Sequence, residues 1–405
     1  MTNKDIIVVG GGAAGFFTAI NAAEMNPDAK ISILERGKEV LTKVKISGGG
    51  RCNVTHAEFL PKELSKNYPR GEKELRGPFH SFMTGDTMEW FQKRGVDLKI
   101  EDDGRIFPVS NSSQTIIDCF LNETRRLGIE VQMNHSVQQI FQVEKKWQIE
   151  TNQENFIADK IVIATGSNPK IWNLLKNLGH TIVSPVPSLF TFHIKDNRIK
   201  DLAGISTHAS VKILNQKLES EGPLLITHWG MSGPAVLKLS AWGARELFDC
   251  KYKFKVQVNW LPEISSEEIL EGLKKLKDEH AKQQISKYSQ FELPKRLWQS
   301  LVNASEISET EKWADLNKNQ LQNLTLQLSS AEFNVEGKST FKEEFVTAGG
   351  VALNEVNFKT FESKKCNNLY LTGEVLNIDA ITGGFNFQNA WTGGFLAARA
   401  ITNNK

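Results

Sequence analysis

The chain has 405 residues, of which 40% are hydrophobic and 24% are charged, and its formal net charge at pH 7 is +2. This length allows roughly two or three domains, and the composition is that of a globular protein. The nearly neutral charge balance gives no reason to expect a nucleic-acid or membrane partner. We find no run of about 20 apolar residues and no leader pattern, so we expect neither a transmembrane helix nor a signal peptide.

The four cysteines are far apart in the sequence, and no Cys-x-x-Cys motif is present. They are Cys52, Cys119, Cys250 and Cys366. This spacing predicts neither a disulfide framework nor a metal site. We therefore expect a cytoplasmic protein whose thiols are reduced.

The first 35 residues have the pattern of a strand, a helix and a second strand. An apolar, β-branched run at 5–10 predicts a buried strand, 14–25 predicts a helix and 30–35 predicts the next strand. The motif Gly-Gly-Gly-Ala-Ala-Gly at 10–15 joins the first strand to the helix. Glu35 follows twenty residues later, which is the spacing of a dinucleotide-binding βαβ unit.

Each glycine of that fingerprint has a separate physical role. Gly10 permits the tight turn, Gly12 lets the backbone approach a pyrophosphate, and Gly15 lets the helix pack against the strand. The helix N-terminus offers unpaired N–H groups to phosphates, and Glu35 can accept a hydrogen bond from a ribose hydroxyl. The cofactor contacts predicted in this unit are Gly10, Gly12, Ala13, Ala14, Gly15, Glu35 and Arg36.

A second nucleotide signature lies near the end of the chain. The predicted strand 368–371 runs into Gly373 and Glu374, and Gly383 and Gly384 precede a predicted helix. A first-strand loop together with this last-strand signature indicates one fold whose ends meet around a single dinucleotide, which we predict to be FAD. The strand end Ala164-Thr165-Gly166 supports this interpretation.

We expect the helix after Gly384 to direct its N-terminus at the pyrimidine edge of the flavin, where its dipole would stabilise the reduced form. The alternative is a glycine turn ahead of a packed C-terminal helix. Glu374 or Asp379 could lie near the ribityl and pyrophosphate groups. Further cofactor contacts predicted here and elsewhere are Lys43, Val137, Ala164, Thr165, Gly166, Gly373, Phe385 and Asn386.

Residues 43–56 are expected to form a loop that contains Ser47-Gly48-Gly49-Gly50-Arg51-Cys52-Asn53. Its glycines expose backbone amides and Arg51 supplies a cation, so all seven residues are predicted to contact the cofactor. Cys52 could be a nucleophile, but a lone cysteine without a neighbouring base is more often structural.

The catalytic residue is not identified by the sequence, and the candidates are Arg51, Arg105 and His228. His228 precedes Trp229, which could form a wall of a substrate pocket. A capped turn with a structural histidine is an equally good interpretation of that motif.

We expect an α/β fold with a discontinuous, Rossmann-like FAD-binding domain at 1–188 and 348–405. A β-rich domain is predicted at 189–262 and 326–347, with a helical insertion at 263–325.

These motifs together resemble the YhiN/BaiN-like family of bacterial FAD-dependent flavoproteins, which are often described as NAD(P)/FAD-dependent or aminoacetone-oxidase-like oxidoreductases. The matching stretches are 9–15, 46–55, 104–108, 227–234, 347–351 and 373–388. The resemblance implies a split FAD domain with a nested insertion, and a flavin lined by 47–53 and 383–388. Ser167, Asn377 and Phe385 depart from the usual family pattern, and Phe385 cannot replace a tyrosine as a proton donor.

The resemblance leaves the reaction open. We expect reduction of an activated double bond or conjugated carbonyl compound by NAD(P)H, ahead of oxidation of a small amine such as an amino-ketone. No second Gly-x-Gly-x-x-Gly motif follows a strand, so NAD(P)H would bind transiently. An RNA-modifying flavoprotein is a weaker alternative, because the segment with lysines at 274–287 also carries Glu268, Glu271, Asp278 and Glu279. The sequence does not give the oligomeric state.

Overall fold

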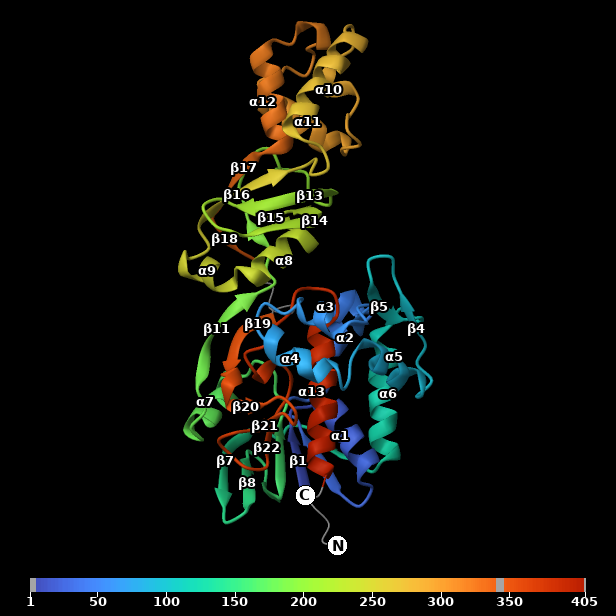
Figure 1. Cartoon of the computed structure of the whole chain (residues 1–405), viewed down its shortest axis with the longest axis vertical. Coiled ribbons are helices and arrows are strands. Elements are labelled where there is room, and N and C mark those ends of the chain that lie inside the picture. Colours follow the sequence, from blue (N-terminus) through green and yellow to red (C-terminus); the bar gives the residue numbers. More distant parts are fainter. Residues whose placement is uncertain (1–4, 340–345, 404–405) are drawn as a thin grey trace. The chain divides into compact units, whose positions relative to one another are not determined.

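The structure is a computed structural model that describes residues 5–339 and 346–403. The chain divides into two units (Figure 1). Unit 1 comprises Met1–Val186 and Val346–Lys405, and unit 2 comprises Pro187–Phe345. The described residues contain no helix that is long and apolar enough to cross a membrane.

Unit 1 is built on a seven-stranded sheet in the order β20-β21-β22-β10-β1-β2-β6. The five strands from β22 to β6 are parallel, and β20 and β21 extend the β22 edge in antiparallel pairs. The central strands are almost entirely buried and rich in Ile and Val, as expected of a parallel sheet covered on both faces. The strand bounds are β1 Asp5–Val9, β2 Lys30–Leu34, β6 Glu130–Gln132, β10 Lys160–Ile163, β20 Val356–Asn357, β21 Glu362–Ser363 and β22 Leu369–Leu371.

Helices from opposite ends of the sequence pack against each other in unit 1. These are α1 (Ala13–Met25) and α13 (Phe385–Thr402), which appear side by side in blue and red in Figure 1. Gly394 permits this close approach, because a Cβ atom there would lie 3.0 Å from Thr18 Oγ1 and 3.2 Å from the carbonyl oxygen of Ala14.

The remaining elements of unit 1 are short helices and three small sheets. The helices are α2 Thr42–Gly50, α3 Pro61–Ser65, α4 Glu72–Phe79, α5 Thr84–Gln92, α6 Ser113–Arg126 and α7 Pro169–Asn177. The small sheets contain β3 Thr55–His56, β4 Leu98–Ile100 and β5 Arg105–Pro108; β7 Val137–Val143, β8 Lys146–Thr151 and β9 Asn155–Ala158; and β11 Ile182–Ser188 with β19 Val346–Val351.

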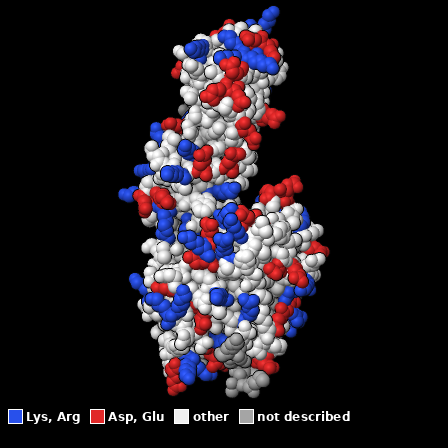
Figure 2. Space-filling model, viewed as in Figure 1, with Lys and Arg blue, Asp and Glu red and all other residues white. Residues whose placement is uncertain are grey.

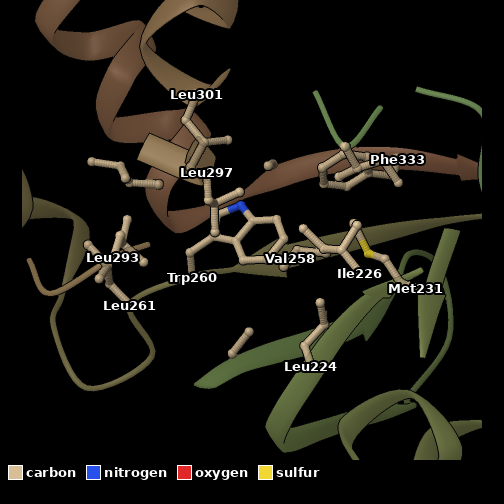
Figure 3. Close-up of a cluster of buried hydrophobic side chains, with 14 of the residues drawn as sticks. Leu224, Ile226, Met231, Val258, Trp260, Leu261, Leu293, Leu297, Leu301 and Phe333 are labelled. Carbon is tan, nitrogen blue, oxygen red and sulfur yellow. The ribbon is translucent and has the colours of Figure 1, made fainter. Parts of the chain in front are cut away.

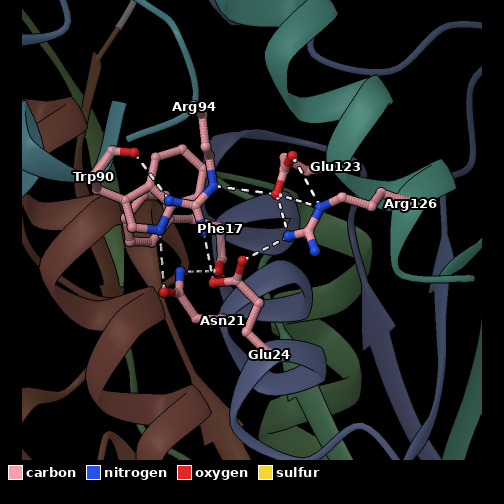
Figure 4. A network of polar contacts seen from close by, with 7 residues as sticks. All are labelled: Phe17, Asn21, Glu24, Trp90, Arg94, Glu123 and Arg126. Atoms are coloured by element: carbon pink, nitrogen blue, oxygen red, sulfur yellow. Dashed lines mark hydrogen bonds and ion pairs between the residues drawn. The ribbon is translucent and has the colours of Figure 1, made fainter. Parts of the chain in front are cut away.

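A polar network joins α1, α5 and α6 (Figure 4). Trp90 Nε1 donates to Asn21 Oδ1 over 3.1 Å, and the Arg94 guanidinium lies 3.7 Å from the Trp90 ring centre. Arg94 also pairs with Glu24 at 2.5 Å, and Arg126 bonds both Glu24 and Glu123. The network fixes the outer end of α1, away from its glycine-rich start.

Unit 2 contains an antiparallel seven-stranded sheet in the order β17-β16-β13-β14-β15-β12-β18. Its strands are β12 Phe192–His193, β13 Ser206–Ile213, β14 Glu219–Thr227, β15 Gly230–Ser232, β16 Phe254–Asn259, β17 Ala331–Val335 and β18 Gly337–Lys338. Its helices are α8 Pro234–Trp242, α9 Ala244–Asp249, α10 Ser266–Glu279, α11 Lys295–Ala304 and α12 Lys318–Ser329.

One hydrophobic cluster extends from this sheet into the helices (Figure 3). Trp260 follows β16 and lies in the same cluster as Leu297 and Leu301 of α11 and Phe333 of β17. The 263–325 segment therefore shares a core with the sheet, and its treatment as a separate helical insertion stays a prediction.

Two expectations for local structure were wrong. Residues 43–56 are not a continuous loop, because α2 covers Thr42–Gly50 and β3 follows; the glycines at 48 and 49 have left-handed dihedrals that interrupt the helix. The second segment of the predicted β-rich domain, 326–347, begins with the last turn of the helix α12, whose Leu324 and Leu328 are buried at helical spacing. Residues 340–345 of that segment lie outside the described residues.

Candidate functional site

The glycine loop after β1 is tightly packed at Gly10, Gly11 and Gly15 and open at Gly12. Gly10 has φ +116°, and a Cβ atom there would lie 2.5 Å from the carbonyl oxygen of Ala164. A Cβ atom at Gly15 would collide with the carbonyl oxygen of Gly10, whereas one at Gly12 would meet nothing within 4 Å. Gly12 precedes α1 without a side-chain cap, so the loop leaves room for a phosphate at the helix N-terminus.

Glu35 braces this loop. Its Oε2 accepts a hydrogen bond from the Gly11 N–H over 2.8 Å, and its Oε1 accepts one from the Gly37 N–H over 2.8 Å. Each carboxylate oxygen has a second lone pair, so the predicted bond from a ribose hydroxyl is compatible with both contacts. The sequence pattern did not reveal this bracing role.

A solvent-open pocket lies beside Glu35. The predicted cofactor residues that line it are Gly10, Glu35, Arg36, Val137 and Thr165. The Thr165 Oγ1 is buried and has no hydrogen-bond partner among the described residues. An orphaned hydroxyl and a carboxylate in one pocket fit the sugar and base of a dinucleotide.

Several other residues that line this pocket were not predicted, and two of them are polar residues next to Val137. His135 and Ser136 follow β6 and line the pocket beside Val137. The end of the short strand at 130–132 is the signal that could have identified them, because ligands of open parallel sheets bind outside the carboxyl ends of strands.

The predicted Ser47–Asn53 segment forms the end of α2 and the turn after it. The backbone φ angles at Gly48, Gly49 and Gly50 are +58°, +68° and +83°. Cβ atoms at Gly49 and Gly50 would meet nothing within 4 Å. These two glycines are therefore next to open space, as a cofactor-lining turn requires. The Ser47 hydroxyl is used within the helix, because its Oγ donates to the Val44 carbonyl.

Cys52 is not a suitable nucleophile. Its side chain is completely buried, and burial raises the pKa of its thiol to about 12, against a smaller opposing effect of Ser47. Because the thiolate is the reactive form, Cys52 is inert at neutral pH. Its positive φ of +61° indicates a role in the turn.

The candidate residues Arg51 and Arg105 lie close together. Glu101 bonds both, through Arg51 Nη1 at 2.6 Å and Arg105 Nη2 at 3.4 Å. Both guanidinium groups also face the Phe107 ring, at 3.9 Å and 5.3 Å from its centre, and Arg105 pairs with Asp103 at 2.6 Å. The two cations are thus balanced by two carboxylates, and the cluster carries little net charge toward a substrate.

The two predicted acidic residues that follow β22 have basic partners. Glu374 pairs with Lys43 at 2.6 Å, and the Glu374 side chain is 17% exposed. Asp379 is fully buried and is bound by Arg70, whose Nε donates to Asp379 Oδ1 over 2.5 Å. Glu374 therefore keeps access to solvent near Gly166, while Asp379 holds the loop before α13.

The glycine turn before α13 is held on several sides. Gly384 has φ +94°, and a Cβ atom there would lie 2.6 Å from the Thr55 carbonyl oxygen. Tyr68 Oη donates to the Phe385 carbonyl over 2.6 Å. The Asn386 side chain makes two hydrogen bonds to the Ala380 backbone, so it orders the preceding loop and does not point freely at a cofactor.

Further contacts tie α13 to β3, and sequence reasoning did not predict them. Gln388 Oε1 accepts from Thr55 Oγ1 at 2.6 Å and from Thr87 Oγ1 at 3.0 Å, and Trp391 Nε1 donates to the Val54 carbonyl. His56, Tyr68 and Arg70 were also missed, since each stands alone in the sequence without a motif around it.

His228 belongs to unit 2, in the turn between β14 and β15. The side chains of His228 and Trp229 are exposed, and the Trp229 and His193 ring centres are 6.4 Å apart. Gly230 is necessary here, because its φ is +147° and a Cβ atom would collide with the Phe192 carbonyl. The turn is thus well defined, and the catalytic role of His228 stays a prediction.

A parallel sheet with an open glycine loop at β1, a pocket at the strand ends and a C-terminal helix packed on α1 defines a Rossmann-type dinucleotide-binding flavoprotein. The chain matches the family model "HI0933-like protein Rossmann domain" over residues 4–400. It therefore belongs to the HI0933-like family, and it is an FAD-dependent oxidoreductase.

The sequence relatives span nearly the whole chain. A "3-dehydro-bile acid delta(4,6)-reductase" of Clostridium scindens is 30% identical over 97% of this chain and 98% of its own length. Proteins named "Ribosomal RNA dihydrouridine synthase" are 26% identical in Haemophilus influenzae and 27% identical in Escherichia coli, over 98% and 99% of this chain and 98% of each relative.

Solved structures share the fold at low identity. A 3-ketosteroid delta1-dehydrogenase from Sterolibacterium denitrificans aligns with a TM-score of 0.53 and 11% identity, covering 99% of this chain and 100% of that one. A 3-ketosteroid-delta4-(5alpha)-dehydrogenase from Rhodococcus jostii RHA1 aligns with a TM-score of 0.51 and 12% identity, covering 99% and 97%.

Proposed function

We propose that this protein reduces a carbon–carbon double bond conjugated to a carbonyl group, with FAD as the bound cofactor and NAD(P)H as the electron donor. One observation carries the proposal. Relatives that align over almost the entire chain are named for different substrates, yet both names describe hydrogenation of a C=C bond activated by a neighbouring carbonyl group.

The residues of unit 1 fit the cofactor that this reaction needs. The open space at Gly12, the orphaned Thr165 hydroxyl and the pocket beside Glu35 would hold the adenosine and pyrophosphate parts of FAD. We propose that Gly49, Gly50 and the turn before α13 line the isoalloxazine. When bound, FAD supplies a hydride equivalent to one carbon of the double bond.

The second carbon of the double bond must receive a proton from the protein or from water. Cys52 is excluded as the donor by its burial and fixed turn geometry, and Phe385 carries no ionisable group. Arg105 and His228 remain the proposed candidates for contact with the substrate. Arg51 is more suited to hold the loop, since it lies closer to both Glu101 and the Phe107 ring than Arg105 does.

We favour a small substrate such as a 3-oxo steroid over RNA. The lysines of the helical segment of unit 2 are largely paired: Lys274 binds Glu271 at 2.6 Å, Lys275 binds Glu279 at 3.7 Å, and Lys277 donates to the Leu316 carbonyl. Figure 2 shows acidic and basic side chains mixed over this segment. A mixed surface gives weak attraction to phosphates.

The test begins with anaerobic mixing of FAD-loaded protein and NADPH or NADH, followed by addition of a 4-en-3-one steroid. Rapid bleaching of the flavin and its reoxidation by the enone are the expected results. If unmodified ribosomal RNA reoxidises the bleached flavin and the enone does not, this result would favour the RNA substrate. Absence of bleaching, with hydrogen peroxide release from an amino-ketone, would favour the amine oxidase.

A further inference from the structure

The peptide bond between Gly383 and Gly384, which we name the turn peptide, is held at both of its polar atoms. The Gly383 carbonyl oxygen lies 3.2 Å from His56 Nδ1. With the Asn53 amide in the orientation that its neighbours can satisfy, its oxygen accepts from the Gly384 N–H over 3.1 Å and its nitrogen donates to the carbonyls of Thr55 and Ile106. Asn53, which precedes β3, and His56, the last residue of β3, thus fix one peptide plane.

Such a restraint matters because both residues of the turn peptide are glycines. Gly383 has φ +129° and Gly384 has φ +94°. Glycine adopts positive and negative φ with similar ease, so this peptide could rotate at small cost without its partners. A rotation would reorient the first backbone N–H groups of α13, which have no intrahelical acceptor.

The His56 ring fits closely between two glycines. A Cβ atom at Gly104, whose φ is +82°, would lie 2.7 Å from His56 Nε2, and one at Gly383 would lie 3.3 Å from His56 Nδ1. The ring also lies 4.6 Å from the Phe385 ring, centre to centre. Because a carbonyl oxygen can only accept, Nδ1 is the nitrogen that carries the proton.

We propose that His56 is a positioning residue for the flavin: its Nδ1–H fixes the turn peptide and so directs the N-terminal amides of α13 at the pyrimidine edge of the isoalloxazine. This inference rests on the proposed position of the flavin. The amides and the dipole of an 18-residue helix favour the negative charge of the reduced form, so their orientation sets both cofactor affinity and redox potential.

The experiment compares His56→Ala with His56→Asn, because the Asn amide nitrogen can occupy the position of Nδ1. The readouts are the FAD dissociation constant and the midpoint potential of the bound flavin, measured without substrate or NAD(P)H. We expect His56→Ala to raise the dissociation constant about fivefold and to lower the potential, as loss of one net hydrogen bond would. His56→Asn should stay near the wild type.

His80→Ala is the matched control, since His80 is an exposed histidine at the end of α4. A folded His56→Ala protein with unchanged affinity and potential would overturn the proposal. If His56→Ala does not fold, His56→Gln replaces it, because Gln places its amide near the position of Nε2 and not of Nδ1. In that case, equal FAD dissociation constants and midpoint potentials for His56→Asn and His56→Gln would overturn the proposal. Both readouts are independent of whether the enzyme reduces an enone.

Discussion

The N-termini of α1 and α13 have the same sequence signature and different surroundings. Each helix begins directly after a glycine and has no side-chain cap. A Cβ atom at Gly12 would meet nothing within 4 Å, whereas one at Gly384 would lie 2.6 Å from the Thr55 carbonyl oxygen. Glycine thus leaves open space before α1 and permits close backbone packing before α13.

The largest expected effect tests the loop that leads into the second helix. Arg70→Ala should lower the free energy of unfolding by about 3–5 kcal/mol, because it leaves the buried Asp379 carboxylate without its cation. Asp379→Asn should cost less, since a neutral amide has a smaller desolvation penalty. Denaturant unfolding measures both, with the exposed Arg76→Ala as control. Similar stabilities for all three variants would refute the role of the pair.

The next prediction concerns packing at the start of α13. Gly384→Ala should lower the free energy of unfolding by about 2 kcal/mol, because the methyl group meets Thr55 backbone and φ is +94°. Thermal unfolding of the FAD-free protein measures the effect. Gly85→Ala is the control, since a Cβ atom there meets nothing within 4 Å and the residue lies inside α5. A Gly384→Ala protein that unfolds at the wild-type temperature would show that the start of α13 is not closely packed, and the proposed difference between the N-termini of α1 and α13 would be refuted.

Gly12→Ala should show the opposite behaviour. Its φ is −96° and its surroundings are open, so the FAD-free protein should keep its unfolding midpoint. The added methyl group would occupy the space proposed for the pyrophosphate, and the FAD dissociation constant should rise at least about tenfold. Titration with FAD followed by flavin fluorescence measures it. Wild-type affinity in this variant would place the pyrophosphate elsewhere.

The smallest expected effect is a pH dependence that lies outside both turns. His180 bonds Glu355 and Ser363, each at 3.0 Å, and burial lowers its pKa. The unfolded chain takes up this proton near pH 6.5, so stability should fall as the pH drops below about 6.5. Burial alone would raise the pKa of Glu355, but hydrogen bonds from Thr181, Lys365 and His180 outweigh it and lower the pKa to about 2. The unfolded chain therefore takes up a proton at Glu355 more readily than the folded protein does, and stability should fall further below about pH 4.5.

His180→Gln should flatten the dependence of the unfolding midpoint on pH between about 5 and 7. The residues 10–15 and 383–385 carry no ionisable side chains, so the contrast between Gly12→Ala and Gly384→Ala should persist across this range. An unchanged slope in His180→Gln would assign the pH dependence to other groups.

The sequence predicted the βαβ unit well, since local periodicity and glycine spacing determine it. The expected strands at 5–10 and 30–35 and the helix at 14–25 are confirmed within about one residue. The predicted residues Gly10, Glu35 and Thr165 do line one pocket, because parallel strands bring their carboxyl ends to the same edge.

Other features depend on tertiary contacts that no local pattern contains. The Asp379–Arg70 pair joins residues 309 positions apart, and the His56 contact to Gly383 joins residues 327 apart. The helix α2 was missed because it ends in three glycines, Gly48 to Gly50. Glycine has a low helix propensity, so the whole segment resembles a loop in sequence.

The packing of α1 against α13 has a consequence for synthesis of the chain. α1 is complete once residue 25 has been made, but the helix that covers it ends at residue 402. β22, which extends the central sheet, is equally late. Unit 2 is contiguous in sequence and can bury its own core while the ribosome is still adding residues. Nascent unit 1 must therefore keep the apolar face of α1 from aggregating until almost all of the chain has been translated.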